Sequence, residues 1–452
     1  MSQEVLIKGR RKNGSTFERR IPIDIKKLDL SWMELETVDL SPLRHCPQLQ
    51  TLILGRNIPF GEDNSLAIDL TPLQHFPKFE SLALSGKQLV SLDLSPLQYC
   101  PQLRELHFSL NSLAKADLSP LQYCSQLQNL ALSGNHLERL DLNPLEHCSQ
   151  LQNLLLFVNE LEELNLDPLQ HCFELRQLCI SGNHLPTIDL TPLQYCSHLQ
   201  SVQISGNHLS TIDLSPLQHC SRLISFVLGS GLPLRKENFL LTVDLTPLQH
   251  CCQLKNLVLS GNRLKNLNLS PLEHCSQLEN LDLSLNQLVS IDLSPLQHCP
   301  SLQNLVLFGN PLKNIDLSPL QHCPQLRSLY LGSVLPLRKR NQLVTIDLSP
   351  LEHCPQLQSL ILSGNQLKGV DLSFLGSCTK LDILTLDANQ LTRLDLSPLF
   401  SCKNLRELRI DNNVVLEGNA EWENRELPNE LEKRREQIIW KSLDDLEDMQ
   451  GF

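Results

Sequence analysis

The sequence lacks long apolar runs, and basic residues are outnumbered by acidic ones. No stretch of 18 apolar residues occurs in the 452-residue chain, so no membrane-spanning helix is predicted. The first residues, MSQEVLIKGRRKNG, lack the apolar core of a secretory signal peptide. Lys and Arg total 38 against 50 Asp and Glu, giving a net charge of −12, which repels nucleic acid and anionic membranes. We therefore expect a cytoplasmic protein that binds neither nucleic acid nor membrane.

Signatures of catalysis are also missing. The sequence contains no phosphate-binding P-loop, no protein-kinase signature and no G-x-S-x-G nucleophile motif. We expect no enzyme activity, no catalytic residues, no metal and no cofactor.

A short motif, Asp-Leu-Ser-Pro-Leu, recurs along almost the whole chain. Its copies are 24 residues apart, apart from three intervals of 30 or 31 residues. Self-similarity at such a period predicts a solenoid of stacked repeats. The motif starts at Asp39, Asp69, Asp93, Asp117, Asp141, Asn165, Asp189, Asp213, Asp244, Asn268, Asp292, Asp316, Asp347, Asp371 and Asp395.

Each repeat follows the pattern L-x-x-L-x-L-x-x-N-x-L-x-x-I-D-L-S-P-L-x-x-C-x-x, and about sixteen copies lie in phase between residues 25 and 416. The strand signature L-x-x-L-x-L-x-x-N-x-L resembles that of the leucine-rich repeat family, here in a 24-residue variant with a DLSPLxxC segment. The resemblance implies an α/β fold, a right-handed horseshoe-shaped solenoid. Its concave face would be a parallel β-sheet, and its convex face would consist of short helical or 3-10 turns.

Three columns of this pattern have structural explanations. The repeated Asn, as in Asn135, is expected to satisfy buried backbone groups where the chain leaves the strand. Ser or Thr before Pro is a favoured N-cap with Pro at the first helical position. The Asp two residues before it is expected to accept hydrogen bonds in an Asx-type turn. A divalent cation held between Asp side chains of adjacent repeats is the alternative.

Fourteen of the sixteen cysteines also form a column, and nine of them follow a histidine. Phe76 replaces the cysteine once, and Phe can neither bind a metal nor form a disulfide. The column is therefore interpreted as apolar core filler rather than as a zinc or disulfide framework. Cys179 lies instead in a concave-face column with His107 and Asp282, several repeats away from each, so no direct catalytic triad is expected.

The ends of the chain depart from the repeat. Residues 1–24 are predicted to form a β-hairpin cap with a type I′ turn at Asn13-Gly14. Residues 417–452 are predicted to form a capping helix, from Pro428 to Met449 with Asn429 as N-cap, and an acidic tail. Three repeats carry insertions that are expected to project from one edge of the array: Gly55 to Ser65, Gly229 to Leu240 and Gly332 to Leu343.

The concave face varies between copies and is unusually apolar. Exposed apolar surface with aromatic anchors and neighbouring basic groups is typical of interaction sites. Two apolar clusters and two basic segments of the insertions are the candidate partner-binding residues. They are Leu155, Phe157 and Val158; Val306, Phe308 and Tyr330; Arg235 and Lys236; and Arg338, Lys339 and Arg340.

Members of the leucine-rich repeat family mostly recognise proteins through the concave face. The resemblance therefore implies a non-enzymatic scaffold or adaptor that binds a protein partner, and we expect a monomer. A regulator of a phosphatase or GTPase and an exported surface adhesin are the alternatives.

Overall fold

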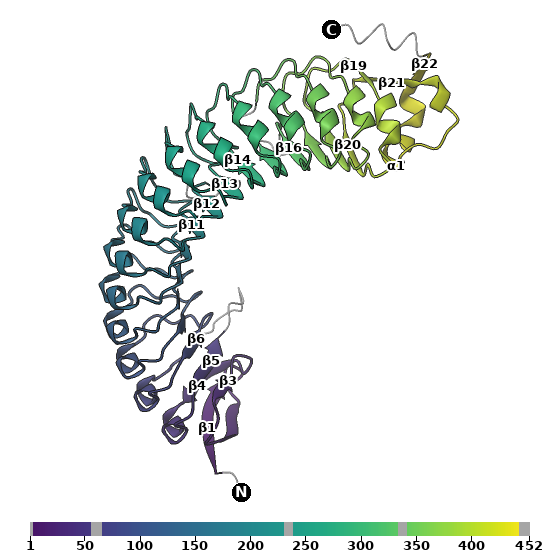
Figure 1. The fold of residues 1–452 in the computed structure, drawn as a ribbon. Coiled ribbons are helices and arrows are strands. Elements are labelled where there is room, and N and C mark those ends of the chain that lie inside the picture. The colour runs from purple at the N-terminus through teal and green to yellow at the C-terminus, as the bar shows by residue number, and fades with distance from the viewer. Residues whose placement is uncertain (1–2, 56–65, 230–237, 333–340, 443–452) are drawn as a thin grey trace. The chain divides into compact units, whose positions relative to one another are not determined.

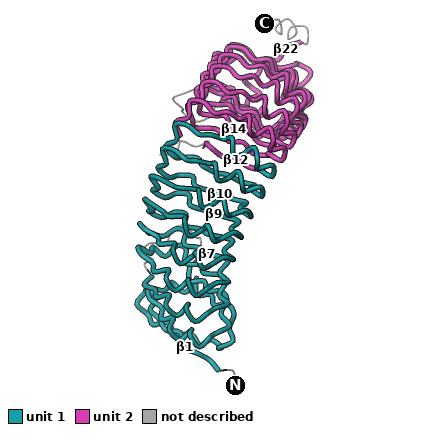
Figure 2. The backbone as a smooth tube through the Cα atoms, turned by 60° about the vertical axis from the view of Figure 1, so that its left-hand side comes forward, with its two compact units in different colours: residues 1–223 teal, residues 224–452 magenta. Residues whose placement is uncertain are grey.

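The computed structural model describes residues 3–55, 66–229, 238–332 and 341–442. Two compact units divide the chain, unit 1 from Met1 to Leu223 and unit 2 from Ile224 to Phe452 (Figure 2). Within each unit every repeat contributes one short strand and one 3-10 turn on the opposite side of the chain (Figure 1). The fold is a solenoid with parallel strands, as the sequence predicted.

The repeat strands pair in parallel with their successors in sequence. In unit 1 they are β3 (Lys27–Asp29), β5 (Thr51–Gly55), β6 (Ser81–Leu84), β7 (Glu105–His107), β8 (Asn129–Ala131), β9 (Asn153–Leu155), β10 (Gln177–Cys179) and β11 (Ser201–Gln203). In unit 2 they are β12 (Ser225–Val227), β13 (Asn256–Val258), β14 (Asn280–Asp282), β15 (Asn304–Val306), β16 (Ser328–Tyr330), β17 (Ser359–Ile361), β18 (Ile383–Thr385) and β20 (Glu407–Arg409).

The leucines of the L-x-L pattern set the register of these strands. Leu130, Leu154 and Leu178 pair across β8, β9 and β10, and all three are buried. Successive residues of a strand point to opposite faces, so a slip by one residue would expose every leucine in the column. The in-phase repeat therefore specifies both the sheet and the apolar core behind it.

The 3-10 turns begin at the Ser or Thr of the motif. In unit 1 they are η1 (Ser41–His45), η2 (Thr71–His75), η3 (Ser95–Tyr99), η4 (Ser119–Tyr123), η5 (Asn143–His147), η6 (Asp167–His171), η7 (Thr191–Tyr195) and η8 (Ser215–His219). In unit 2 they are η9 (Thr246–His250), η10 (Ser270–His274), η11 (Ser294–His298), η12 (Ser318–His322), η13 (Ser349–His353), η14 (Ser373–Gly376) and η15 (Ser397–Ser401).

The predicted N-cap was wrong. The N-cap of η8 is Leu214, and Ser215 is already the first residue of the turn. The side chain that satisfies the start of the turn is that of Asp213, whose Oδ1 accepts a hydrogen bond from the Ser215 N–H at 2.8 Å. The equivalent bond, 2.8–3.0 Å long, is present in all fifteen copies, including those with Asn165 and Asn268. The Asx-turn interpretation of this column is confirmed.

The Asn column joins each repeat to the one before it. Asn135 is buried, and its Nδ2 donates to the carbonyls of Leu132 at 2.8 Å and of Phe108, in the preceding repeat, at 3.1 Å. Its Oδ1 accepts from the Leu113 N–H at 3.1 Å. In two repeats with insertions, the column Asn is replaced by an Asn at the end of the insertion. Asn238 donates to the Leu228 carbonyl and Asn341 donates to the Leu331 carbonyl, a replacement that the sequence pattern did not reveal.

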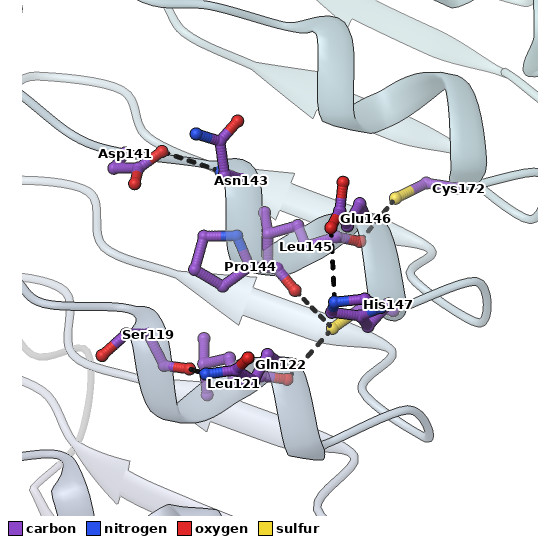
Figure 3. A network of polar contacts seen from close by, with 11 residues as sticks. Ser119, Leu121, Gln122, Asp141, Asn143, Pro144, Leu145, Glu146, His147 and Cys172 are labelled. Atoms are coloured by element: carbon purple, nitrogen blue, oxygen red, sulfur yellow. Dashed lines mark hydrogen bonds and ion pairs between the residues drawn. The ribbon is translucent and has the colours of Figure 1, made fainter.

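The cysteine column lies under the 3-10 turns and is fully buried. Cys172 Sγ donates to the Leu145 carbonyl of the preceding repeat at 3.5 Å (Figure 3). Desolvation raises the pKa of the Cys148 and Cys172 thiols to about 12, so both remain protonated. Phe76 is equally buried and packs against Phe79, with ring centroids 6.2 Å apart. The column is core filler, as its exchange for Phe indicated.

The N-terminus forms an antiparallel hairpin of β1 (Glu4–Arg11) and β2 (Thr16–Pro22). Strand β1 also pairs with β4 (Leu35–Asp39) in the first repeat, so the sheet order is β2-β1-β4. Between Asn13 and Gly14, only Gly14 has a positive φ, at 78°, so the turn is not the predicted type I′ turn.

The continuous helix predicted after Pro428 is wrong. The chain forms η16 (Ala420–Trp422), the short α1 (Asn429–Glu432) with Pro428 as its N-cap, η17 (Arg435–Gln437) and strand β22 (Ile438–Lys441). Strand β22 pairs in parallel with β21 (Val415–Asn419), which in turn pairs with β19 (Arg393–Asp395). Ile438 is buried whereas Ile439 is 51% exposed, the alternation of a strand.

The predicted projection of the three insertions lies largely outside the described residues, as do Leu443 and Leu446 of the predicted helix. Within the described ranges, no helix is both long and apolar enough to span a bilayer.

We predict that one thiol per native chain reacts with a chromogenic thiol reagent. Cys252 is exposed, whereas the other fifteen cysteines are buried, and a buried thiol of raised pKa supplies little thiolate. Absorbance measured before and after denaturant checks the count. Cys252→Ser should abolish the native signal, and a native signal that survives this substitution would contradict the burial of the column.

A second prediction concerns Asp244, which accepts hydrogen bonds from the Thr246 hydroxyl and N–H at 2.6 and 2.9 Å. Both bonds lower its pKa, so its charge stabilises the fold above about pH 4, and this contribution is lost as pH falls through the lowered folded-state pKa. Because the side chain is exposed, Asp244→Ala should cost only about 0.5–1 kcal/mol at pH 7.

Asp244→Asn keeps the acceptor oxygen without the charge, as Asn268 does naturally. The difference in free energy of unfolding between wild type and this variant should vanish at low pH. Denaturant titrations at several pH values measure it, and a difference independent of pH would rule out the carboxylate as its source.

Candidate functional site

Three columns of side chains cover the outward face of the sheet, the face that the sequence predicts to be concave. The first column is polar and forms side-chain hydrogen bonds between strands, for example from Asn256 Nδ2 to Ser225 Oγ at 3.0 Å. The middle column is mostly apolar. The third is largely Ser or Gly lying close to the backbone, as Ser133 and Ser260 do with exposures of 1% and 0%.

One predicted cluster stands out from this pattern, and we name Leu155, Phe157 and Val158 the Phe157 patch. Phe157 replaces the small residue of the third column and is 38% exposed, and Val158 is 57% exposed. Leu155, the last residue of β9, is half-buried beside them. An apolar group therefore projects where the neighbouring repeats present serine and glycine.

The backbone of the Phe157 patch is strained. Val158 has a φ of 56°, in the left-handed region, where the preceding and following repeats have Gly134 and Gly182. Leu110 and Leu285 adopt the same conformation at this position, but both are half-buried, whereas Val158 is exposed. A β-branched residue in this conformation is an outlier that costs about 1–2 kcal/mol. The patch thus carries a residue that folding alone does not favour, and such strain is a reason to look for function.

The second predicted cluster, Val306, Phe308 and Tyr330, is less prominent. Val306 and Tyr330 are paired across β15 and β16, and all three side chains are half-buried. We name them the Tyr330 patch. The basic residues of both insertions, Arg235 and Lys236 and also Arg338, Lys339 and Arg340, lie outside the described residues. The position of Arg338, Lys339 and Arg340 beside this patch therefore stays a prediction.

The predicted surface cysteine is in fact buried. Cys179 is 5% exposed, and its Sγ lies 3.5 Å from Gln203 Oε1 in the next repeat. Burial raises the pKa of its thiol, and burial lowers the pKa of His107 three repeats earlier. The exposed thiol is that of Cys252, which follows a column cysteine at a position where most other repeats have Ser or Pro. This preference for turn residues was the signal that could have marked Cys252 as exposed.

Sequence reasoning missed a groove in unit 1, formed where successive repeats leave the Asn ladder and approach the 3-10 turns. Residues 114–117, 138–141, 162–165 and 186–189 line it, and its volume is about 1060 Å³. A contiguous hollow of about 380 Å³ adds Glu160, His184 and His208. The charged residues of the lining are mainly acidic, in contrast to the apolar Phe157 patch, and these charges at variable positions were the signal that was overlooked.

Metal chemistry has no support in the described ranges. There, no group of three or more His, Cys, Asp or Glu side chains is arranged to hold a metal ion.

We predict that Val158→Gly stabilises the protein. Glycine adopts a φ of 56° without the steric cost of valine, and the exposed side chain contributes little packing. The free energy of unfolding should rise by about 0.5–1 kcal/mol, measured by denaturant titration.

Val90→Gly is the matched control. Val90 is 69% exposed and has no positive φ, so its replacement by glycine should lower the stability by about 0.5–1 kcal/mol. Equal losses in both variants would show that Val158 is not strained.

Comparison with known proteins gives the family. The model of the leucine rich repeat matches residues 252–312 and 355–415, and that of the BspA type leucine rich repeat region matches residues 119–240. Among curated proteins, none matches the sequence at a significant level.

Solved structures share the fold. The functional domain of InlJ from Listeria monocytogenes, which includes a cysteine ladder, is 23% identical with a TM-score of 0.66, over 88% of this chain and 75% of that one. A leucine-rich repeat protein of Leptospira interrogans is 22% identical with a TM-score of 0.62, over 82% and 91%. The plant peptide hormone receptor RGFR1, in complex with RGF2, is 20% identical with a TM-score of 0.66, over 96% and 71%.

These identities show a common fold rather than a common activity. The in-phase strands, the buried Asn column and the two family models agree with one another. The chain belongs to the leucine-rich repeat family.

Proposed function

We propose that this chain is a non-enzymatic scaffold that binds a protein partner on the outward face of its sheet, centred on the Phe157 patch. The observation that carries the proposal is Val158, a strained and exposed apolar residue where the flanking repeats have glycine. A residue that costs folding energy and leaves apolar surface in water is explained if a partner covers it.

The chemistry of the patch favours a macromolecular partner. Phe157 and Val158 project from a face on which the serine of the preceding repeat, Ser133, is buried against the backbone. They therefore form a protrusion rather than a pocket for a small molecule. Aromatic side chains at the centre of an interface are typical binding hot spots. The structural neighbour RGFR1 holds a peptide hormone, RGF2, which supports a polypeptide as the class of partner.

The Tyr330 patch in unit 2 is proposed as a second contact area on the same kind of face. Its half-buried side chains offer less apolar area per residue than Phe157 and Val158, so it ranks behind the first patch. We further propose a monomeric protein in the reducing cytoplasm, a location supported by sixteen cysteines without a disulfide.

The test restores the repeat pattern at the patch. Phe157→Ser/Val158→Gly gives repeat 153–176 the residues of its neighbours, Ser133-Gly134 and Ser181-Gly182. Capture of the protein partner from native lysate, quantified by mass spectrometry, should fall by at least about tenfold, the effect of losing one buried aromatic anchor.

Because Phe157 is only 38% exposed, circular dichroism and a denaturant titration of the double variant must show an intact fold before a loss of capture is attributed to the patch. Val90→Ser, which removes an exposed valine elsewhere in unit 1, is the control and should leave capture unchanged. Undiminished capture by the Phe157/Val158 variant would refute the site.

A further inference from the structure

The acidic groove begins where the Phe157 patch ends. Val158 is followed directly by Asn159 of the buried ladder and then by Glu160, Leu161 and Glu162. Glu160 and Glu162 both line the 380 Å³ hollow, and Glu162 also lines the larger groove. An apolar patch and an acidic groove are therefore consecutive parts of one repeat.

Two glutamates of neighbouring repeats lie side by side in this groove. The Glu162 N–H donates to the Glu138 carbonyl at 3.2 Å, so the two side chains leave adjacent backbone positions. Glu160 pairs with His136 at 2.8 Å, and Glu163 pairs with Arg139 at 3.3 Å. Within the described ranges, no lysine or arginine forms an ion pair with Glu138 or Glu162.

The rest of the groove reinforces this negative charge. Six carboxylates line it, those of Asp117, Glu138, Asp141, Glu162, Glu163 and Asp189, against the two cationic side chains of Lys115 and Arg139. Hydrogen bonds from the Ser119 N–H and hydroxyl lower the pKa of Asp117, which is therefore ionised at neutral pH. A concave surface lined by one sign of charge concentrates its field and attracts the opposite charge.

The repeat fold does not require acid at these positions. The position that holds Glu138 and Glu162, directly after the leucine of N-x-L, holds Lys265, Lys313 and Lys368 in unit 2, and all of these side chains are exposed. The same backbone bond occurs there, from the Lys313 N–H to the Val289 carbonyl at 3.4 Å. The backbone at this position accommodates either charge, so the fold does not explain why Glu138 and Glu162 are acidic.

The groove also has an apolar component. Leu140, Leu164, Pro186 and Ile188 lie among the carboxylates, and Leu164 and Ile188 are half-buried. Lysine and arginine place their aliphatic stems on such surface while their charged ends reach acidic groups. A short basic segment of a protein therefore matches both the negative charge and the apolar lining residues of the groove.

We propose that the groove binds a basic segment of the partner, with lysine or arginine side chains on Glu138 and Glu162 and an adjacent apolar residue on the Phe157 patch. The inference rests on the proposed function and adds the chemical class of the partner. Nucleic acid would be repelled by the six carboxylates, so the basic groups belong to a polypeptide.

The first test measures binding of a synthetic peptide to the full chain by fluorescence anisotropy. The peptide carries several lysines and arginines around one phenylalanine. Glu138→Lys/Glu162→Lys should weaken binding by at least about tenfold. Wild-type affinity should fall as salt rises from about 50 to about 500 mM. A peptide with glutamates in place of the basic residues should not bind.

Lys265→Glu/Lys313→Glu is the matched control, a charge reversal at the same repeat position of unit 2. It makes the chain more acidic, so a general attraction between chain and peptide would strengthen binding, whereas the proposed site predicts unchanged affinity. Equal affinity for the peptide in wild type and in Glu138→Lys/Glu162→Lys would overturn the proposal.

Partner capture separates this inference from the proposed function. Loss of capture in both the Phe157/Val158 and the Glu138/Glu162 variants supports both. Loss in the Phe157/Val158 variant alone refutes the basic segment and leaves the patch standing, and capture retained in both variants refutes both. Sedimentation should show one mass for all variants, and a dimer that Glu138→Lys/Glu162→Lys dissociates would make a second copy the occupant, overturning a separate partner.

Discussion

Hydrogen bonding between successive repeats is the constraint on which this structure depends. Most repeat strands are three residues long, too short to stand alone, and their backbone groups are satisfied only by the repeat before and the repeat after. The buried Asn extends this dependence past the end of the strand, because its amide bonds two carbonyls in different repeats and one N–H. Stability then resides in the interfaces between repeats, and buried positions are held nearly invariant along the chain.

That dependence explains what the sequence could predict. Leu154, Asn135 and Cys172 are wholly or almost wholly buried and meet the same environment in every copy, so repetition reveals their role many times over. The alternation of leucines in L-x-L predicted the strands, and the replacement of one cysteine by Phe76 indicated that the cysteine column fills the core. The role of the Asp column could also be predicted, because the hydrogen bond that each Asp accepts from the N–H two residues later is local and does not depend on the remaining fold.

Features set by a single non-local contact could not be predicted in the same way. Leu431, Ile438 and Ile439 are spaced roughly as on a helix, yet Ile438 and Ile439 pair with β21 as part of a strand. Trp440 of the same strand packs against Phe400, with ring centroids 5.9 Å apart. Cys179 is buried and its thiol contacts Gln203 of the next repeat, a contact that the local sequence does not show. The acidic groove arises from residues 24 positions apart that no local pattern connects, so it emerged only from the stacked repeats.

A repeat protein supplies its own reference for function, since each copy shows what the fold requires at a position. Compared with the repeats directly before and after, Phe157 and Val158 replace serine and glycine with exposed apolar side chains, and Val158 is strained. Glu138 and Glu162 carry acidic charge at a position where three repeats of unit 2 have lysine. These departures concern different columns and different physical properties, yet they fall in two successive repeats of unit 1. The overlap of the exposed apolar residues and the acidic pair in these repeats is what binding of one partner to both would require.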